Sequence, residues 1–307
     1  MPPFQILSLS GGGYLGLYTA LVLAEFESRV GRPLASCFDL LAGTSVGGII
    51  ALGLAAERPA SEIVDTFEEI GTSVFSERPA PATWIGKIRD GARSFFTPKY
   101  SGSALRDTLE QLFGADTLVG ELRHPVIVPT VNVTSGRPQI FKTPHHPDFQ
   151  RDHLLKVVDV AMATSAAPTY FPLVEVRDHL FADGGLYANS PDLLALHEVE
   201  HFLKVPSSEV RLLSVGTTTS LFSFPHVDGT KLGLKQWAGR LARVMIAAQQ
   251  ASVNDIVGHR LQDRYLRVDS VQAPELMPYL RLDVATEEAR KAIRAMASTA
   301  TQNVVNE

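Results

Sequence analysis

The chain has 307 residues, of which 45% are hydrophobic and 20% are charged. Both fractions are typical of globular proteins and exclude a disordered or collagen-like chain. A formal net charge of −5 gives no general attraction to nucleic acid, and the single cysteine, Cys37, excludes a disulfide framework and a thiolate zinc site. We therefore expect a cytoplasmic protein that binds no nucleic acid polymer and forms one domain over residues 1–307.

The first third of the chain alternates apolar runs, glycine turns and helical patterns. The apolar run Phe4–Leu9 is followed by glycines and then by apolar positions at helical spacing from Gly16 to Val30. A second apolar run, Phe38–Ala42, precedes another glycine turn and a helical pattern that extends to Ala56. This alternation predicts an α/β fold with a mostly parallel central sheet and helices on both faces.

Later segments continue this pattern. Ser61 and Ser103 are expected to cap helices that end near Phe75 and at Gly114. The further expected elements are a hairpin of Pro125–Thr134 and Pro138–Lys142, a helix at Leu154–Thr164, an extended Leu173–Val176, a helix opened by Ser190-Pro191 and a strand at Val210–Val215. From about residue 220 the chain is expected to be mainly helical, with an interruption at Tyr265–Val268.

The segment Ser76–Tyr100 has an unusual composition, rich in proline, glycine, arginine and aromatic residues. Apolar residues such as Trp84 and Phe95 alternate there with basic residues such as Arg89. This mixture is typical of a segment that inserts at a lipid interface, and it also fits a lid packed on the protein itself.

The most informative local signal is Gly43-Thr44-Ser45-Val46-Gly47, between an apolar strand and a helix. In a sharp strand-to-helix turn the serine hydroxyl is exposed above the sheet, and the flanking glycines Gly43 and Gly47 leave room for the turn. The amides at the start of the following helix would favour a developing oxyanion. The pattern predicts Ser45 as a catalytic nucleophile, with a plain tight turn as the alternative.

A serine nucleophile needs a base, and the residues leave two kinds of candidate. Four histidines follow acidic residues in the order Ser, acid, His of α/β-hydrolases, namely His197, His201, His226 and His259. The other candidate is Asp183, which follows the apolar Leu180-Phe181 and precedes Gly184-Gly185. Burial would raise the pKa of this aspartate above its usual value of about 4 and make it a better base. A turn-forming Asp-Gly pair is the structural alternative.

The loop Gly11-Gly12-Gly13-Tyr14-Leu15-Gly16 formally matches the G-x-G-x-x-G motif of dinucleotide-binding proteins. Such a site needs an acidic residue at the end of the second strand, whereas Asp39 lies at its beginning. Adjacent parallel strands would bring this loop and the Ser45 turn to one edge of the sheet. We therefore expect the amides of Gly11, Gly12 and Gly13 to form an oxyanion hole.

His197-Glu198-Val199-Glu200-His201 matches the H-E-x-x-H motif of zinc proteases. Glu200 places a second charge inside the motif, and no third ligand follows at a diagnostic spacing. We expect an amphipathic helix with an exposed polar face and no metal at this position.

Taken together, these motifs resemble the patatin-like phospholipase family from about Phe4 to Gly216. The similarity also includes Ala163-Thr164-Ser165-Ala166-Ala167-Pro168, and Asn189 with Pro191 behind the Asp183 motif. The resemblance implies a three-layer patatin-like fold and a Ser45–Asp183 catalytic dyad without histidine. It also implies an oxyanion hole in the glycine loop and cleavage of phospholipid acyl esters through an acyl-enzyme, without metal or cofactor.

The sequence departs from the family pattern at one position, because the first loop usually reads Gly-Gly-Gly-x-Arg-Gly and residue 15 here is leucine. Since backbone amides bind the oxyanion, the expectation at this point is that Leu15→Arg keeps or raises activity. The alternative function is a catalytically weak lipase-fold module that senses a ligand.

Among bacterial members, the segment Leu9–Ala20 resembles the phospholipase effectors of cyclic-nucleotide anti-phage systems. That resemblance implies a cyclic dinucleotide activator and a phospholipid membrane surface as the substrate. It further implies peripheral contact with the inner membrane when the enzyme is active, and it is compatible with a homo-oligomer.

Overall fold

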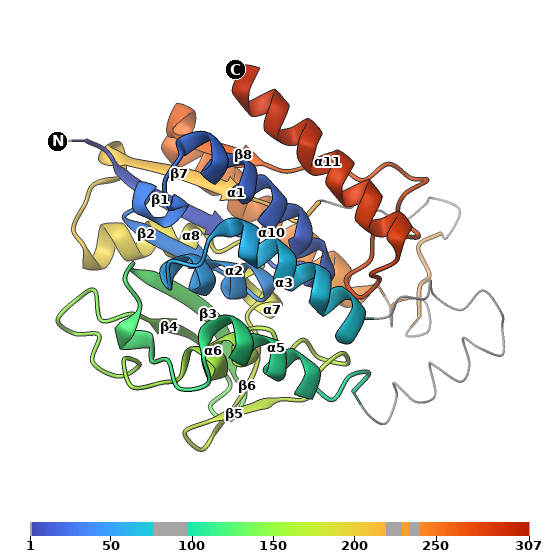
Figure 1. The fold of residues 1–307 in the computed structure, drawn as a ribbon, viewed down its shortest axis with the longest axis horizontal. Helices are drawn as coiled ribbons and strands as arrows, with labels where there is room; N and C mark the ends of the chain where they lie inside the picture. The colour runs from blue at the N-terminus through green and yellow to red at the C-terminus, as the bar shows by residue number, and fades with distance from the viewer. Residues whose placement is uncertain (1, 76–97, 219–228, 234–236, 238–239, 307) are drawn as a thin grey trace.

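The computed structural model describes residues 2–75, 98–218, 229–233, 237 and 240–306, and shows one mixed sheet between two layers of helices (Figure 1). Most of Ser76–Tyr100, interpreted above as a lipid-interface segment or a lid, lies outside the described residues, and so does His226. The three-layer α/β class expected from the alternating pattern is confirmed.

Five parallel strands form the larger part of the sheet, in the order β3-β2-β1-β7-β8. Their bounds are β1 Phe4–Leu9, β2 Leu40–Gly43, β3 Val126–Asn132, β7 Val210–Val215 and β8 Tyr265–Val268. Leu9 pairs with both Gly43 and Val215, so these three strands end side by side. The loops that follow them therefore share one edge of the sheet.

The other three strands are antiparallel: β4 (Arg137–Lys142), β6 (His179–Asp183) and β5 (Val174–Val176). Strand β4 pairs along one edge of β3, as the expected hairpin requires. On the other edge, β2 pairs with the beginning of β3 and β6 pairs with its end, Thr130 facing Asp183. The ends of β2 and β6 therefore approach each other along β3, which brings the segment after Gly43 close to Asp183.

The two faces of the sheet bury different side chains, since successive residues of a strand point to opposite sides. Leu7 and Leu41 pack with the helices of one layer, whereas Ile6 and Leu40 pack with those of the other. The first layer contains α1 (Gly16–Val30), α2 (Val46–Ala55), α3 (Ala60–Ser73), α5 (Ser103–Phe113), α6 (Val157–Thr164) and α11 (Glu287–Asn306). The second contains α8 (Asp192–His197) and α10 (Leu241–Leu261), and the short α7 (Gly185–Ala188) directly follows β6.

Three local expectations were wrong. Helix α3 begins at Ala60 and α5 begins at Ser103 behind Gly102, so neither Ser61 nor Ser103 is the capping residue. The segment Tyr265–Val268, expected only as a break between helices, is a fifth parallel strand paired with β7.

Among the described residues, no helix is both long and apolar enough to cross a bilayer.

Candidate active site

Ser45 lies in the turn between β2 and α2, with φ 55° and ψ −126°. A positive φ is unusual for a residue other than glycine and is typical of a strained nucleophile turn. The flanking glycines are needed sterically: a Cβ on Gly43 would lie 2.8 Å from the Gly48 nitrogen, and one on Gly47 would lie 2.6 Å from the Ser10 carbonyl oxygen. The turn therefore has the geometry that its sequence pattern indicates.

Asp183, the last residue of β6, faces this turn. The Ser45 hydroxyl donates a hydrogen bond of 2.7 Å to Asp183 Oδ2, and the two residues are 9% and 6% exposed. The other carboxylate oxygen, Oδ1, accepts the Gly185 amide at 2.6 Å. Gly184 passes so close to Pro129 that an added Cβ would lie 2.6 Å from its carbonyl carbon. The structure thus brings together a serine and an aspartate 138 residues apart, called the dyad below.

The environment of the dyad changes the acidity of the carboxyl group. Burial raises the pKa of Asp183 to about 6, although the hydrogen bonds from Ser45 and Gly185 partly oppose this effect. At neutral pH the carboxylate is still mostly ionised, and it accepts a proton more readily than an ordinary aspartate does. The aspartate therefore combines the position and the basicity that proton removal from Ser45 requires.

Thr164, at the end of α6, is hydrogen-bonded to the turn that contains Ser45. Its Oγ1 accepts the Ser45 amide at 3.0 Å and donates to the Pro129 carbonyl oxygen at 2.7 Å, while its own carbonyl accepts the Gly184 amide at 3.3 Å. One buried residue is thus bonded to both motifs of the dyad. No role for Thr164 was predicted from the residues, and its place in the Ala163–Pro168 stretch was the available signal.

The glycine loop lies against Ser45, as expected. A Cβ on Gly11 would lie 3.2 Å from the Cβ of Ser45. The Gly11 amide, however, already donates to the Asn189 carbonyl oxygen at 2.9 Å, so it is not available to an oxyanion in this conformation. Among the described residues, the amides of Gly12 and Gly13 have no hydrogen-bond partner. Of the three amides expected to form the oxyanion hole, those of Gly12 and Gly13 therefore remain as candidate donors.

The side chain of Leu15 is 5% exposed and packs in the apolar core of the first helix layer. An arginine at this position would bury a charge among aliphatic and aromatic side chains. The structure therefore places position 15 in the core, and the effect of Leu15→Arg on activity stays a prediction.

The dinucleotide interpretation of the glycine loop also fails on geometry. Asp39 lies beside Gln5, where its carboxylate accepts the Gln5 amide at 2.7 Å. This contact is at the start of β1, whereas the glycine loop follows the end of that strand. The acidic residue that would bind a ribose is therefore at the wrong end of the sheet.

The H-E-x-x-H segment does not form a zinc site. His197 and His201 are exposed, with ring centroids 5.0 Å apart, but Glu198 is 1% exposed and accepts hydrogen bonds from Lys142 (2.6 Å) and His145 (3.3 Å). Within the described part of the chain, no group of three histidine, cysteine, aspartate or glutamate side chains could hold a metal ion. In the same part, no histidine is hydrogen-bonded to the dyad.

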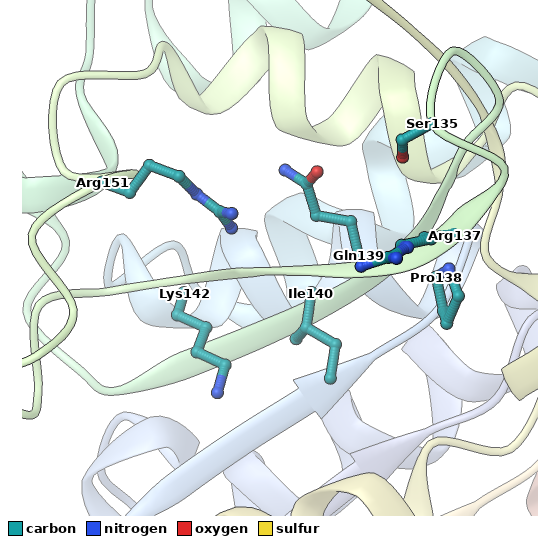
Figure 2. A pocket seen from close by; sticks show the side chains of 7 residues that line it. All are labelled: Ser135, Arg137, Pro138, Gln139, Ile140, Lys142 and Arg151. Carbon is teal, nitrogen blue, oxygen red and sulfur yellow. The ribbon is translucent and has the colours of Figure 1, made fainter.

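An open hollow of about 390 Å³ lies along the outer edge strand β4 (Figure 2). Gln139 and Arg151 lie on one face of the strand, and Lys142 and Ile140 extend to the opposite face. Because β4 is separated from β2 by β3, this hollow does not belong to the dyad.

Comparisons with known proteins identify the family of the chain. The family model described as patatin-like phospholipase matches residues 7–196. A cGAMP-activated phospholipase of Pseudomonas aeruginosa is 46% identical over 277 residues, which cover 90% of this chain and 80% of the relative. Proteins of the same name are 35% identical in Escherichia coli (96% of this chain, 87% of the relative) and 36% identical in Vibrio cholerae (92% and 86%). The chain therefore belongs to the patatin-like phospholipase family.

Proposed function

We propose that this patatin-like phospholipase is a serine acyl hydrolase in which Ser45 is the nucleophile and Asp183 is the base. The observation that carries the proposal is the 2.7 Å hydrogen bond from the Ser45 hydroxyl to a buried carboxylate whose pKa is raised to about 6. The substrate is an acyl ester of a membrane phospholipid, so the activity is of the phospholipase A type.

The reaction proceeds in two balanced halves. As Ser45 Oγ attacks the acyl carbonyl, its proton passes to Asp183 Oδ2, and the tetrahedral intermediate then expels the lysophospholipid alkoxide, which takes that proton back from Asp183. In the second half, a water molecule attacks the acyl carbonyl of the acyl-enzyme while Asp183 removes a proton from that water. The bond between the acyl carbon and Ser45 Oγ then breaks, Asp183 returns the proton to Ser45 Oγ, and a fatty acid leaves.

The negative charge that develops on the carbonyl oxygen is stabilised by the amides of Gly12 and Gly13. These amides come from a loop in contact with Ser45, and they donate without any side-chain rearrangement. The free amides of the first turn of α2, beginning at Val46, add the positive end of a helix dipole. No metal takes part in this mechanism.

The relatives that carry the name cGAMP-activated phospholipase support a proposal for regulation. We infer that a cyclic dinucleotide activates this enzyme. The activated enzyme then hydrolyses phospholipid at the cytoplasmic surface of the inner membrane. The matches cover 80%, 87% and 86% of the length of these relatives.

A fluorophosphonate probe tests the nucleophile directly. We expect labelling of the wild-type chain that is lost in Ser45→Ala and accelerated by cGAMP. Hydrolysis of vesicles that differ in headgroup, with and without cGAMP, then identifies the substrate. Labelling that persists in Ser45→Ala would contradict the assignment of the nucleophile.

The alternative function is a catalytically weak lipase-fold module that senses a ligand. It predicts no labelling of Ser45 by the fluorophosphonate probe, so the same experiment separates the two functions.

The rate of hydrolysis is expected to depend on pH through Asp183. The base must be ionised, and burial raises the pKa of Asp183 to about 6, so kcat/KM should rise between about pH 5 and 7 with its midpoint near 6. The measurement is kcat/KM on a soluble ester from pH 4.5 to 8, with circular dichroism at each pH to confirm that the protein stays folded. A profile that is already flat above about pH 5, as for an ordinary aspartate with a pKa of about 4, would show that the carboxylate is not in an apolar environment.

A further inference from the structure

Two residues bond to Gly11 of the glycine loop: Asn189, between α7 and α8, and Thr217, whose Oγ1 donates to the Gly11 carbonyl oxygen at 2.9 Å. The carbonyl oxygen of Asn189 accepts the Gly11 amide at 2.9 Å, and its side-chain Nδ2 donates to the Gly11 carbonyl oxygen at 3.4 Å. The C=O and N–H of one trans peptide point in opposite directions, so fixing the Gly11 carbonyl also fixes the direction of the Gly12 N–H. Asn189 therefore contributes, together with Thr217, to the orientation of the Gly12 N–H, a proposed oxyanion donor.

Asn189 is in turn held by helix α10, which packs against α7 and α8. Its Nδ2 donates to Gln250 Oε1 at 2.9 Å, and its backbone N–H donates to Gln249 Oε1 at 3.1 Å. The buried residues of α10 are Val257 and Leu261, both in its last turns. The two glutamines therefore attach the middle of this surface helix to the catalytic edge of the sheet.

We propose that Gln250, acting through Asn189, is a positioning residue for the oxyanion hole; this inference rests on the function proposed above. The amide nitrogen of Asn189 has two hydrogens, and its two acceptors are Gln250 Oε1 and the Gly11 carbonyl. The contact to Gly11 is long, so the shorter bond to Gln250 is the one that orients the amide. Without that acceptor the Asn189 side chain is free to turn, and Gly11 loses one of its contacts.

The test compares two substitutions of Gln250. Methionine has a similar length but no strong acceptor, so Gln250→Met is expected to lower kcat about 5- to 20-fold, less than the loss of a whole oxyanion donor, with KM within about twofold of wild type. Gln250→Glu keeps an acceptor for Asn189 and should recover most of the lost kcat. The rate of fluorophosphonate labelling should follow kcat, because the phosphonyl oxygen occupies the same hole.

Asn254 provides the matched control on the same helix. Its Oδ1 accepts a hydrogen bond of 3.2 Å from Ser190 Oγ, beside Asn189 but without contact to the glycine loop. We expect Asn254→Ala to keep kcat within twofold of wild type.

If Gln250→Met fails to fold, Asn189→Asp tests the same link. A carboxylate of the same shape cannot donate a hydrogen bond to Gly11 or to Gln250. The kcat of Asn189→Asp should therefore fall more than that of any Gln250 variant.

Two outcomes would overturn the inference: a wild-type kcat in Gln250→Met, or an equal loss in Gln250→Met, Gln250→Glu and Asn254→Ala, which would indicate general damage to α10. Failure of the proposed function looks different, since the wild-type chain itself would then show no labelling of Ser45.

Discussion

Asp183→Asn is expected to abolish ester hydrolysis and to make the protein more stable at neutral pH. The asparagine keeps the shape of the side chain and an acceptor for Gly185, but it cannot take the proton of Ser45. A general base contributes about 10²- to 10⁴-fold to the rate, so kcat should fall by at least that much. Adding Ser45→Ala should lower it little further, because the two residues act as one unit.

The stability gain follows from the raised pKa. The folded-state pKa of about 6 exceeds the ordinary value of 3.8, so the carboxyl group stabilises the fold when protonated and loses that contribution as the pH rises through about 6. At pH 7.5 the cost of the buried charge amounts to at most about 3 kcal/mol, which Asp183→Asn removes. Thermal unfolding should therefore show a Tm a few degrees higher at pH 7.5, and a smaller gain at pH 5.

Asp192 is the matched control, because it is also a fully buried aspartate. Its carboxylate accepts hydrogen bonds from Ser8 (2.6 Å), Ser214 (2.9 Å) and Tyr265 (2.7 Å), so Asp192→Asn replaces an acceptor by a donor in a fully bonded site and should lower the Tm. Equal losses of Tm in both variants would show that Asp183 is a structural carboxylate.

The parallel part of the sheet could be predicted because its signals are local. Phe4–Leu9 and Phe38–Ala42 are apolar runs that end in glycine turns, and each is followed by a helical pattern. Tyr265–Val268 was not recognised as a strand because it has four residues and lies between helical patterns, so its pairing with β7 determines its structure. Pairing between distant segments leaves no local pattern in a sequence.

The candidate active site likewise combines features that have a local sequence pattern with contacts between distant segments that have none. The turn around Ser45 has a local pattern, but the residues alone left the base open between Asp183 and several histidines. The resemblance to patatin-like phospholipases, and not spacing, pointed to Asp183. The structure supplies the physical reason, which is that β2 and β6 use the same edge of β3 from opposite ends. The contacts of Thr164 and Asn189 were missed because each joins segments that are more than 100 residues apart. One hydrogen bond links Ser45 to Thr164, and two link Gly11 to Asn189.

Gly12→Ala is expected to lower kcat about 100- to 1,000-fold, the loss associated with one oxyanion donor, or roughly 3–4 kcal/mol. The cause is steric: a Cβ on Gly12 would lie 2.5 Å from the Thr217 Cβ and 2.9 Å from its Cγ2. The φ of Gly12 is 172°, an extended value that alanine adopts, so the backbone itself is not strained by the change. Either the loop moves and takes the Gly12 amide with it, or Thr217 turns and breaks its 2.9 Å hydrogen bond to the Gly11 carbonyl.

The steric cause can be separated from other effects with a double mutant. Thr217→Gly removes the atoms that a Cβ on Gly12 would meet, at the cost of the hydrogen bond to Gly11, so this single variant sets a lower baseline of activity. In the Thr217→Gly background, Gly12→Ala should lower kcat little, because the Thr217 atoms that the new Cβ would meet are absent and the two effects are therefore not additive.

Gly258→Ala in α10 is the control for glycine substitution itself. Its Cβ would lie at an ordinary 3.6 Å from Tyr265, so kcat should stay unchanged and the helix should gain about 0.5–1 kcal/mol of stability. If Gly12→Ala turned over near the wild-type rate, the triple-glycine loop would not be the oxyanion hole. The amides at the start of α2 would then have to stabilise the charge alone.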